Sequence, residues 1–217
     1  MPLLLIDLDN TLVDRDAAFR EATSRFLAEH ALPARDLDWL MTVDASGYRP
    51  RADVARAVTA RYGAAVPEAE VRAFLDRGAA ERVTLAEPTR QALVEAAAAG
   101  WDCVIVTNGR VAQQEQKIRR TGLDTLVHAW VISEAVGREK PDPTIFETAA
   151  GTVGASPHGA WVVGDSPHAD VRGAIDIGAW SVWVSSGRTW PEHTYHPTHT
   201  TRDTASGIRL ALRVSSS

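Results

Sequence analysis

Acidic side chains stand at the ends of two apolar runs of the sequence. Asp7 and Asp9, spaced by two residues, end the run 3–8, and Asp165 directly follows the run 160–164. Carboxylates that share a crevice repel each other and need a cation or a shared proton, and oxygen ligands suit a hard divalent ion. The alternative for the first segment is a turn at Asp9 and Asn10, with Thr11 capping the next helix.

Two further segments carry groups suited to binding a phosphoryl oxygen, and the segment of Asp165 carries another acid. Thr107, followed by Asn108, ends another apolar run, and its hydroxyl could act with amide hydrogens at a helix start. Lys140 precedes a predicted helix, and its ammonium would offset clustered carboxylates. Asp170 falls in the first turn of a helix after Asp165. Taken singly, these residues also fit a helix cap, a solvated lysine and an acid at a helix dipole. Taken together, they predict a phosphoryl site.

The elements that must position these residues are short strands separated by helical patterns. Apolar runs occupy residues 3–8, 102–107, 129–133, 160–164 and 180–184, and a weaker edge strand is expected near 199–202. Runs that are apolar at consecutive positions suit strands covered by helices on both faces. The pattern predicts a doubly wound, Rossmann-like α/β core with a parallel sheet, whose ligands bind at the carboxyl ends of the strands.

A long helical insertion separates the first two strands. Apolar residues spaced by three and four predict helices over residues 14–31, 35–41, 52–62 and 67–82. A further helix over 88–99 returns the chain to the sheet. We therefore expect an α/β catalytic core built from residues 1–13 and 85–217, and an inserted α-helical cap over residues 14–84.

The four polar segments resemble the motifs of the haloacid dehalogenase-like hydrolase superfamily. Its first motif, Asp-x-Asp-x-Thr, is similar to Asp7 through Thr11, and the other motifs are similar to Thr107, to Lys140, and to Asp165 with Asp170. The resemblance covers nearly the whole chain, and the insertion resembles a C1-type cap. The stretches 107–109, 120–123 and 132–137, with Lys140 and Pro141, look most like pyrimidine 5'-nucleotidase-like and N-acylneuraminate 9-phosphatase-like members.

This resemblance implies a Mg²⁺-dependent phosphatase that hydrolyses a small phosphomonoester, a nucleotide or a sugar phosphate, through an aspartyl phosphate. Asp7 would be the nucleophile and Asp9 the general acid and base. The metal would be held by Asp7, the backbone carbonyl of Asp9, and Asp165. The resemblance also implies that Thr107, Asn108 and the catalytic Lys140 bind the phosphoryl group, while Asp170 and Thr11 orient these groups from behind.

Other activities share some of these features. Haloacid dehalogenases lack an acid at the position of Asp9, because a halide leaving group needs no proton. Phosphomutases of the superfamily carry all four motifs and stay open. Phospho-aspartate signalling or binding modules also cluster acids with a lysine, but their acid pair is adjacent in sequence and they lack an insertion of this length.

Composition restricts the partners. A net charge of -5 without a basic run argues against a nucleic acid polymer. The apolar start is too short for a signal-peptide core or a membrane span, so we expect a cytoplasmic protein that acts on a small phosphate ester. The single cysteine, Cys103, lies in an apolar run and is expected to pack as a small buried hydrophobe.

Two further groups of residues could bind ligands. Arg49 and Arg51 in the insertion are candidates for contact with the organic part of the substrate. His193, His196 and His199 are spaced by three, as in some zinc or nickel sites, although prolines around them favour a surface loop.

Overall fold

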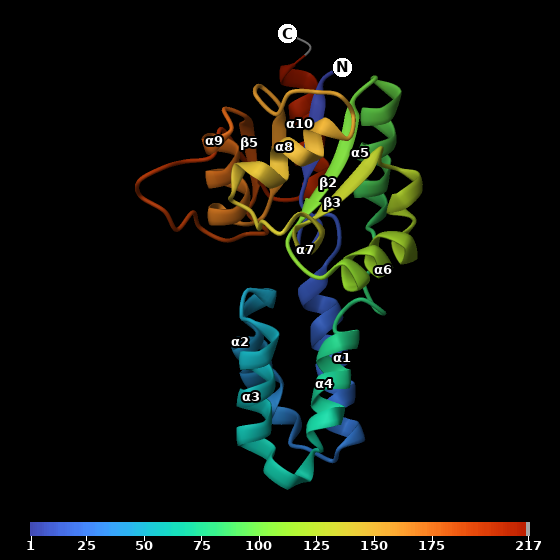
Figure 1. Ribbon diagram of the computed structural model, residues 1–217, viewed down its shortest axis with the longest axis vertical. Coiled ribbons are helices and arrows are strands. Elements are labelled where there is room, and N and C mark those ends of the chain that lie inside the picture. Colours follow the sequence, from blue (N-terminus) through green and yellow to red (C-terminus); the bar gives the residue numbers. More distant parts are fainter. Residues whose placement is uncertain (216–217) are drawn as a thin grey trace. The chain divides into compact units, whose positions relative to one another are not determined.

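The computed structural model describes residues 1–215 and divides into two compact units. The first comprises Met1–Val13 and the chain from Thr84 onward, and the second is Asp14–Val83. The second unit interrupts the first directly after the segment that carries Asp7 and Asp9. Figure 1 shows the helices of the second unit in blue to cyan-green.

The first unit is built on a six-stranded, fully parallel sheet with the order β3-β2-β1-β4-β5-β6. β1 lies at the centre, with Leu5 opposite Val104 on one side and Val162 on the other. The chain builds outward from β1 first to one side and then to the other, which confirms the predicted doubly wound fold. The strands are β1 (Leu3–Ile6), β2 (Asp102–Thr107), β3 (Ala129–Ile132), β4 (Trp161–Gly164), β5 (Trp180–Val184) and β6 (His199–Thr201).

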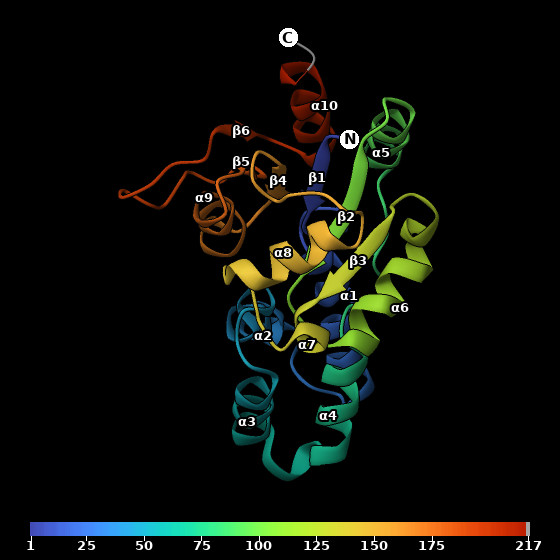
Figure 2. The ribbon, with the colours of Figure 1, turned by 45° about the horizontal axis from the view of Figure 1, so that its top comes forward.

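Helices cover both faces of this sheet (Figure 2). α8 packs on β1, β2 and β3, and Val162 belongs to the same apolar cluster. α10 lies on the opposite face, because its Gly207 is close to Val163 and successive strand residues point to opposite faces. The helices are α5 (Glu87–Ala98), α6 (Val111–Thr121), α7 (Ser133–Val136), α8 (Pro143–Gly151), α9 (Gly173–Asp176) and α10 (Thr204–Val214), with a 3₁₀ turn at Leu123–Thr125 and a π-helical turn at Pro167–Arg172.

The second unit is entirely helical. Its core contains the stacked rings of Phe19, Phe26 and Phe74, with centroids 5.6 Å and 4.3 Å apart along the stack. The predicted fourth helix was too long at its end, since the chain turns at Gly78 with a φ of +51°. The helices are α1 (Arg15–Glu29), α2 (Leu37–Asp44), α3 (Arg51–Tyr62) and α4 (Glu68–Arg77), joined by 3₁₀ turns at Ala34–Asp36, Ala45–Gly47 and Gly63–Ala65.

A buried ion pair joins the first two helices of this unit. The Arg15 guanidinium donates to both carboxylate oxygens of Asp44, with a distance of 2.7 Å between Nη2 and Oδ1. Asp44 is 0% exposed and also accepts a hydrogen bond from the Gly47 amide at 2.9 Å. The guanidinium lies 4.6 Å from the centre of the Phe19 ring. A two-point charged contact of this kind is directional, so it sets how α1 meets α2.

We predict that Asp44→Ala destabilises the helical unit by about 3 kcal/mol, because it removes the carboxylate that a buried guanidinium contacts at two points. Asp38→Ala is the matched control. Asp38 also pairs with an arginine, Arg20, but its side chain is 84% exposed, so its loss should cost less than about 1 kcal/mol. Urea unfolding followed by circular dichroism measures both values, and equal losses would contradict the prediction.

Candidate active site

Three buried carboxylates meet at the carboxyl ends of β1 and β4. Asp7 follows β1 and its amide donates to the Val163 carbonyl at 3.0 Å, while Asp165 follows β4. One oxygen from each of Asp7, Asp165 and Asp170 lies within 4.8 Å of the others. The strand order reverses direction between β1 and β4, which is where ligands bind in doubly wound sheets.

Lys140 lies among these acids. Its Nζ donates to Asp7 Oδ1 at 2.6 Å and to Asp170 Oδ1 at 2.7 Å, and the residue is 6% exposed. Lys140 is therefore not a solvated lysine. The Asn108 side chain holds its backbone on both sides, accepting from the Lys140 amide at 2.8 Å and donating to its carbonyl at 3.1 Å. The end of β2 thus positions the ammonium at the end of β1.

Burial and neighbouring charges shift the pKa values of the groups in this cluster. Burial raises the pKa of Asp7 to about 8, since desolvation and the charges of Asp170 and Asp165 outweigh the attraction of Lys140. Burial and the Asp170 charge likewise raise the pKa of Asp165 to about 7, against the attraction of Arg188. Desolvation lowers the pKa of Lys140, but Asp170 and Asp7 outweigh it and raise that pKa. The carboxyl shifts thus arise first from burial and second from neighbouring carboxylates, and the Lys140 shift reflects the acids that hold its ammonium.

Asp165 and Asp170 are each fixed by further contacts. Arg188 Nη2 donates to Asp165 Oδ2 at 3.0 Å, and the Trp183 indole donates to the Asp165 carbonyl at 2.8 Å. Asp170 Oδ2 accepts from the Ser166 amide at 3.0 Å, so both of its oxygens are engaged. Asp170 therefore supports Lys140, whereas Asp165 has one oxygen facing the cluster.

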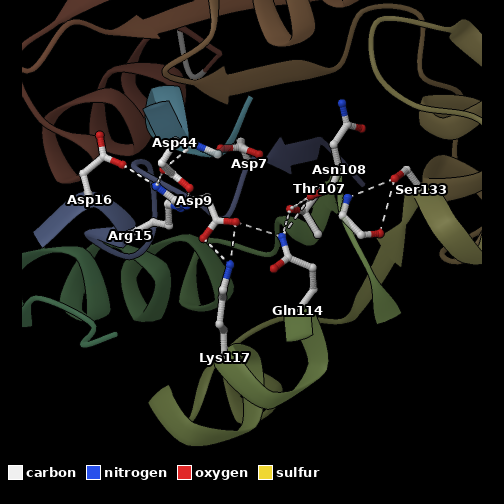
Figure 3. Close-up of polar contacts among 12 residues, drawn as sticks. Asp7, Asp9, Arg15, Asp16, Asp44, Thr107, Asn108, Gln114, Lys117 and Ser133 are labelled. Carbon is white, nitrogen blue, oxygen red and sulfur yellow. Dashed lines mark hydrogen bonds and ion pairs between the residues drawn. The ribbon is translucent and has the colours of Figure 1, made fainter. Parts of the chain in front are cut away.

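Asp9 makes a different set of contacts, toward α6 (Figure 3). Lys117 Nζ lies 2.7 Å from each carboxylate oxygen of Asp9, and Gln114 Nε2 lies 3.0 Å from Oδ2. The same Gln114 nitrogen donates to Thr107 Oγ1 at 2.6 Å. Thr107 and Asp9, from the ends of two neighbouring strands, are thereby connected through one helix.

Thr11 is buried at the end of this first segment. Its carbonyl accepts from the Thr204 hydroxyl at 2.6 Å, which ties the segment to α10. Within residues 1–215, the Thr11 hydroxyl has no hydrogen-bond partner. Within the described residues, the structure therefore shows no contact through which the Thr11 hydroxyl would orient another group, and that role stays a prediction.

The sequence reading missed Gln114, Lys117 and Arg188. A signal existed for the first two, because their spacing of three places both on one face of α6. Both side chains are buried there, which is unusual for a lysine. Arg188 belongs to the loop after β5, and the sequence around it contains no feature that separates it from other surface arginines.

The acidic cluster suits a divalent cation. Its ligands are hard oxygens, three buried carboxylates lie close together, and Asp7 and Asp165 come from the ends of adjacent strands. One or two carboxylates, completed by waters and a phosphate, are what Mg²⁺ needs for octahedral coordination. The residues present therefore fit Mg²⁺.

Other candidate residues lie outside this cluster. His199 begins β6 and stacks on Trp161 at 5.8 Å, and the His196 ring lies 6.4 Å from that of Trp190. His193 lies in the same loop before β6. Cys103 is fully buried, as predicted, and burial raises the pKa of its thiol to about 12. This excludes a reactive thiolate at ordinary pH.

The two arginines proposed for substrate contact belong to the helical unit. Arg49 is exposed, whereas Arg51 Nη1 lies 3.3 Å from Asp44 Oδ1 beside the buried ion pair. Arg51 is thus partly committed to the helical core. No helix within residues 1–215 is long and apolar enough to cross a membrane.

Fold and site together define a doubly wound α/β protein with an acidic cluster and a buried lysine at the switch point. The chain matches the haloacid dehalogenase-like hydrolase model over residues 4–184. It therefore belongs to the haloacid dehalogenase-like hydrolase family, which confirms the resemblance found in the sequence.

Named relatives span several substrates. The chain is 40% identical over 95 residues to the phosphoserine phosphatase of Thermus thermophilus, covering 44% of this chain and 38% of that protein. It is 29% identical over 205 residues to the N-acetylmuramic acid 6-phosphate phosphatase of Pseudomonas aeruginosa, covering 90% and 86%. The matches to the first curated relatives span about two fifths of each relative's length.

A solved structure shares the fold over the whole chain. The HAD-hydrolase YfnB from Bacillus subtilis, crystallised with bound magnesium, superposes with a TM-score of 0.75. The two sequences are 23% identical, and the superposition covers 97% of this chain and 98% of that one.

Gly164→Ala tests how tightly the site is packed. A Cβ at Gly164 would lie 2.2 Å from Asp170 Cγ, so the Asp170 side chain that holds Lys140 must move. We predict a loss of roughly 1–3 kcal/mol in the free energy of unfolding, measured in urea. Gly151→Ala is the control, because within the described chain nothing lies within 4 Å of a Cβ there. A Gly164→Ala protein as stable as this control would contradict the packing argument.

Proposed function

We propose that this protein is a phosphatase that hydrolyses a small phosphate monoester, a nucleotide or a sugar phosphate, through an aspartyl phosphate on Asp7. The observation that carries the proposal is the contact of Lys140 with Asp7 and Asp170 inside an acidic cluster at the switch point. The family and the phosphatases among its relatives support the same reaction. The relatives differ in substrate, which leaves both substrate classes in the proposal.

The first half of the reaction transfers the phosphoryl group to the enzyme. An Asp7 oxygen attacks phosphorus, a bond forms between them, and the bond from phosphorus to the ester oxygen breaks. Asp9 donates a proton to that oxygen, so the product leaves as an alcohol. Splitting one difficult displacement into two easier ones is the gain from the covalent intermediate.

The second half restores the enzyme. Asp9, now ionised, removes a proton from a water molecule as that water attacks the phosphorus of the aspartyl phosphate. The bond between phosphorus and Asp7 breaks, and phosphate is released. Asp9 therefore ends the cycle protonated again, and no other proton donor or acceptor is required.

Positive charges and hydrogen-bond donors offset the negative charge of the phosphoryl group in both halves of the reaction. Asp7, the Asp9 carbonyl and Asp165 would hold Mg²⁺, which supplies positive charge that lets a carboxylate meet a phosphate dianion. Lys140 and the Thr107 hydroxyl bind phosphoryl oxygens. Asn108 holds the Lys140 backbone, and Asp170 holds its ammonium. The ammonium of Lys140 therefore stays in place when Asp7 changes its charge.

We propose that the helical unit, residues 14–84, acts as a cap that selects the organic part of the substrate. Arg49 is the better candidate for that role, because Arg51 already contacts Asp44. Turnover of a panel of nucleotides and sugar phosphates separates the two substrate classes. Isomerisation of a sugar phosphate without phosphate release would instead identify a phosphomutase.

Asp7→Asn should abolish turnover of p-nitrophenyl phosphate with Mg²⁺, by on the order of 10⁴-fold or more, because the nucleophile is lost. Folding should be retained, since Lys140 keeps its contact with Asp170. Phosphate release and circular dichroism measure the two properties. Asp203→Asn, at the cap of α10, is a control that should stay active. Retained activity in Asp7→Asn would rule out Asp7 as the nucleophile.

Mg²⁺ binding should release protons and tighten as pH rises toward about 8. Asp7 and Asp165 have raised pKa values of about 8 and about 7, so the metal-free protein holds protons at neutral pH that a cation displaces. Calorimetric titration in buffers of different ionisation enthalpy measures the release. Mg²⁺ binding that is independent of pH below 8 would contradict these protonation states. In a separate assay, removal of Mg²⁺ by a chelator should stop turnover.

A further inference from the structure

The chain contains only two lysines, and both contact the first acidic motif. The other residues in its Lys and Arg total are all arginines. Lys140 contacts Asp7, and Lys117 contacts Asp9. Lys117 is 5% exposed, and lysine is rarely buried unless it is paired. Solvated surface positions of this protein thus never use lysine, whereas the two acids proposed for catalysis each have one.

Lys117 acts on Asp9 from a fixed direction. It lies on α6, three residues after Gln114, so both side chains leave the same face of the helix toward Asp9 (Figure 3). Equal distances of 2.7 Å from Nζ to the two carboxylate oxygens show that the ammonium contacts both oxygens equally. This contact restricts rotation of the Asp9 side chain.

Gln114 adds a second constraint. An amide nitrogen carries two hydrogens, and Nε2 of Gln114 contacts Asp9 Oδ2 at 3.0 Å and Thr107 Oγ1 at 2.6 Å. It also lies 3.1 Å from the Asn108 carbonyl. The amide therefore sets the separation between the carboxylate and the hydroxyl proposed to bind the phosphoryl group.

A purely structural explanation accounts poorly for this arrangement. Joining α6 to the sheet needs only apolar residues, and replacing buried ion pairs by apolar residues is often neutral or stabilising. Asp9, moreover, keeps a side-chain exposure of 24%, so its carboxylate is held without being sealed from ligands. Catalysis by proton transfer requires a group that is both accessible and fixed in direction.

We propose that Lys117 and Gln114 are positioning residues that hold Asp9 in the orientation from which it protonates the leaving oxygen beside Thr107. The inference rests on the proposed phosphatase function. In the transfer step the proton moves from Asp9 to the ester oxygen as the phosphorus–oxygen bond breaks. Loss of Lys117 leaves Asp9 present but removes one of the contacts that restrict its rotation, so the step that needs its proton slows most.

Two substrates with different leaving groups test this. Nitrophenolate departs without a proton, whereas an alkoxide needs one, and kcat/KM reports the steps up to its departure. For Lys117→Met we expect kcat/KM for an alkyl phosphate to fall at least about tenfold further than for p-nitrophenyl phosphate. Methionine keeps an unbranched buried stem, so the helix should still pack. Lys117→Arg should recover part of the difference.

Arg119→Met is the matched control, because Arg119 lies on the same helix in an exposed pair with Glu115. Its ratio of the two kcat/KM values should equal that of the unmodified protein. An equal fall for both substrates in Lys117→Met would overturn the proposal in favour of a structural role. A raised KM with an unchanged ratio would overturn it by showing that Lys117 binds substrate directly.

A spectroscopic measurement separates this inference from the proposed function. Isotopic labelling of lysine side chains gives two NMR signals, and Lys117→Met assigns them. Asp9→Asn should shift the Lys117 signal far more than the Lys140 signal, and an unmoved Lys117 signal would overturn the contact. Absence of any phosphate release by the unmodified protein would instead count against the phosphatase function, whatever the NMR result.

Discussion

The structure of the first unit depends on the electrostatic balance around Lys140. Asp7, Asp165 and Asp170 are buried within 4.8 Å of one another, where each carboxylate destabilises the ionised form of the next. When all three are ionised, Lys140 and Arg188 supply two positive charges against three negative ones. The remaining negative charge makes the pocket a receptor for cations, and a cation is what allows a phosphate dianion to approach a carboxylate.

Much of the surrounding structure fixes the positions of these charged side chains. The Asp170 side chain occupies the space that a side chain at Gly164 would fill. The Ser166 amide fixes the Asp170 carboxylate there. Asn108 fixes the backbone of Lys140, and α6 fixes Asp9. Each support comes from a loop or helix that directly follows a strand, so the rigid parallel sheet transmits its geometry to the site.

Fold and family define the reaction class more closely than the substrate. The named relatives include phosphatases of phosphoserine and of a muramic acid phosphate. The strand ends that carry the acidic cluster lie within the stretch that the family model matches. The helical unit, with its own aromatic core and buried Arg15–Asp44 pair, is a separate compact unit.

The amino-acid sequence by itself determined the strands, their parallel arrangement and the acids Asp7 and Asp165, because apolar runs and the residues after them are local patterns. It also marked Lys140, yet it left open whether that lysine was solvated. Only the tertiary structure decided that Lys140 is buried against Asp7, that Lys117 and Gln114 hold Asp9, and that Arg188 contacts Asp165. These contacts join residues 23 to 133 positions apart in the chain, and no local pattern encodes a distance of that kind.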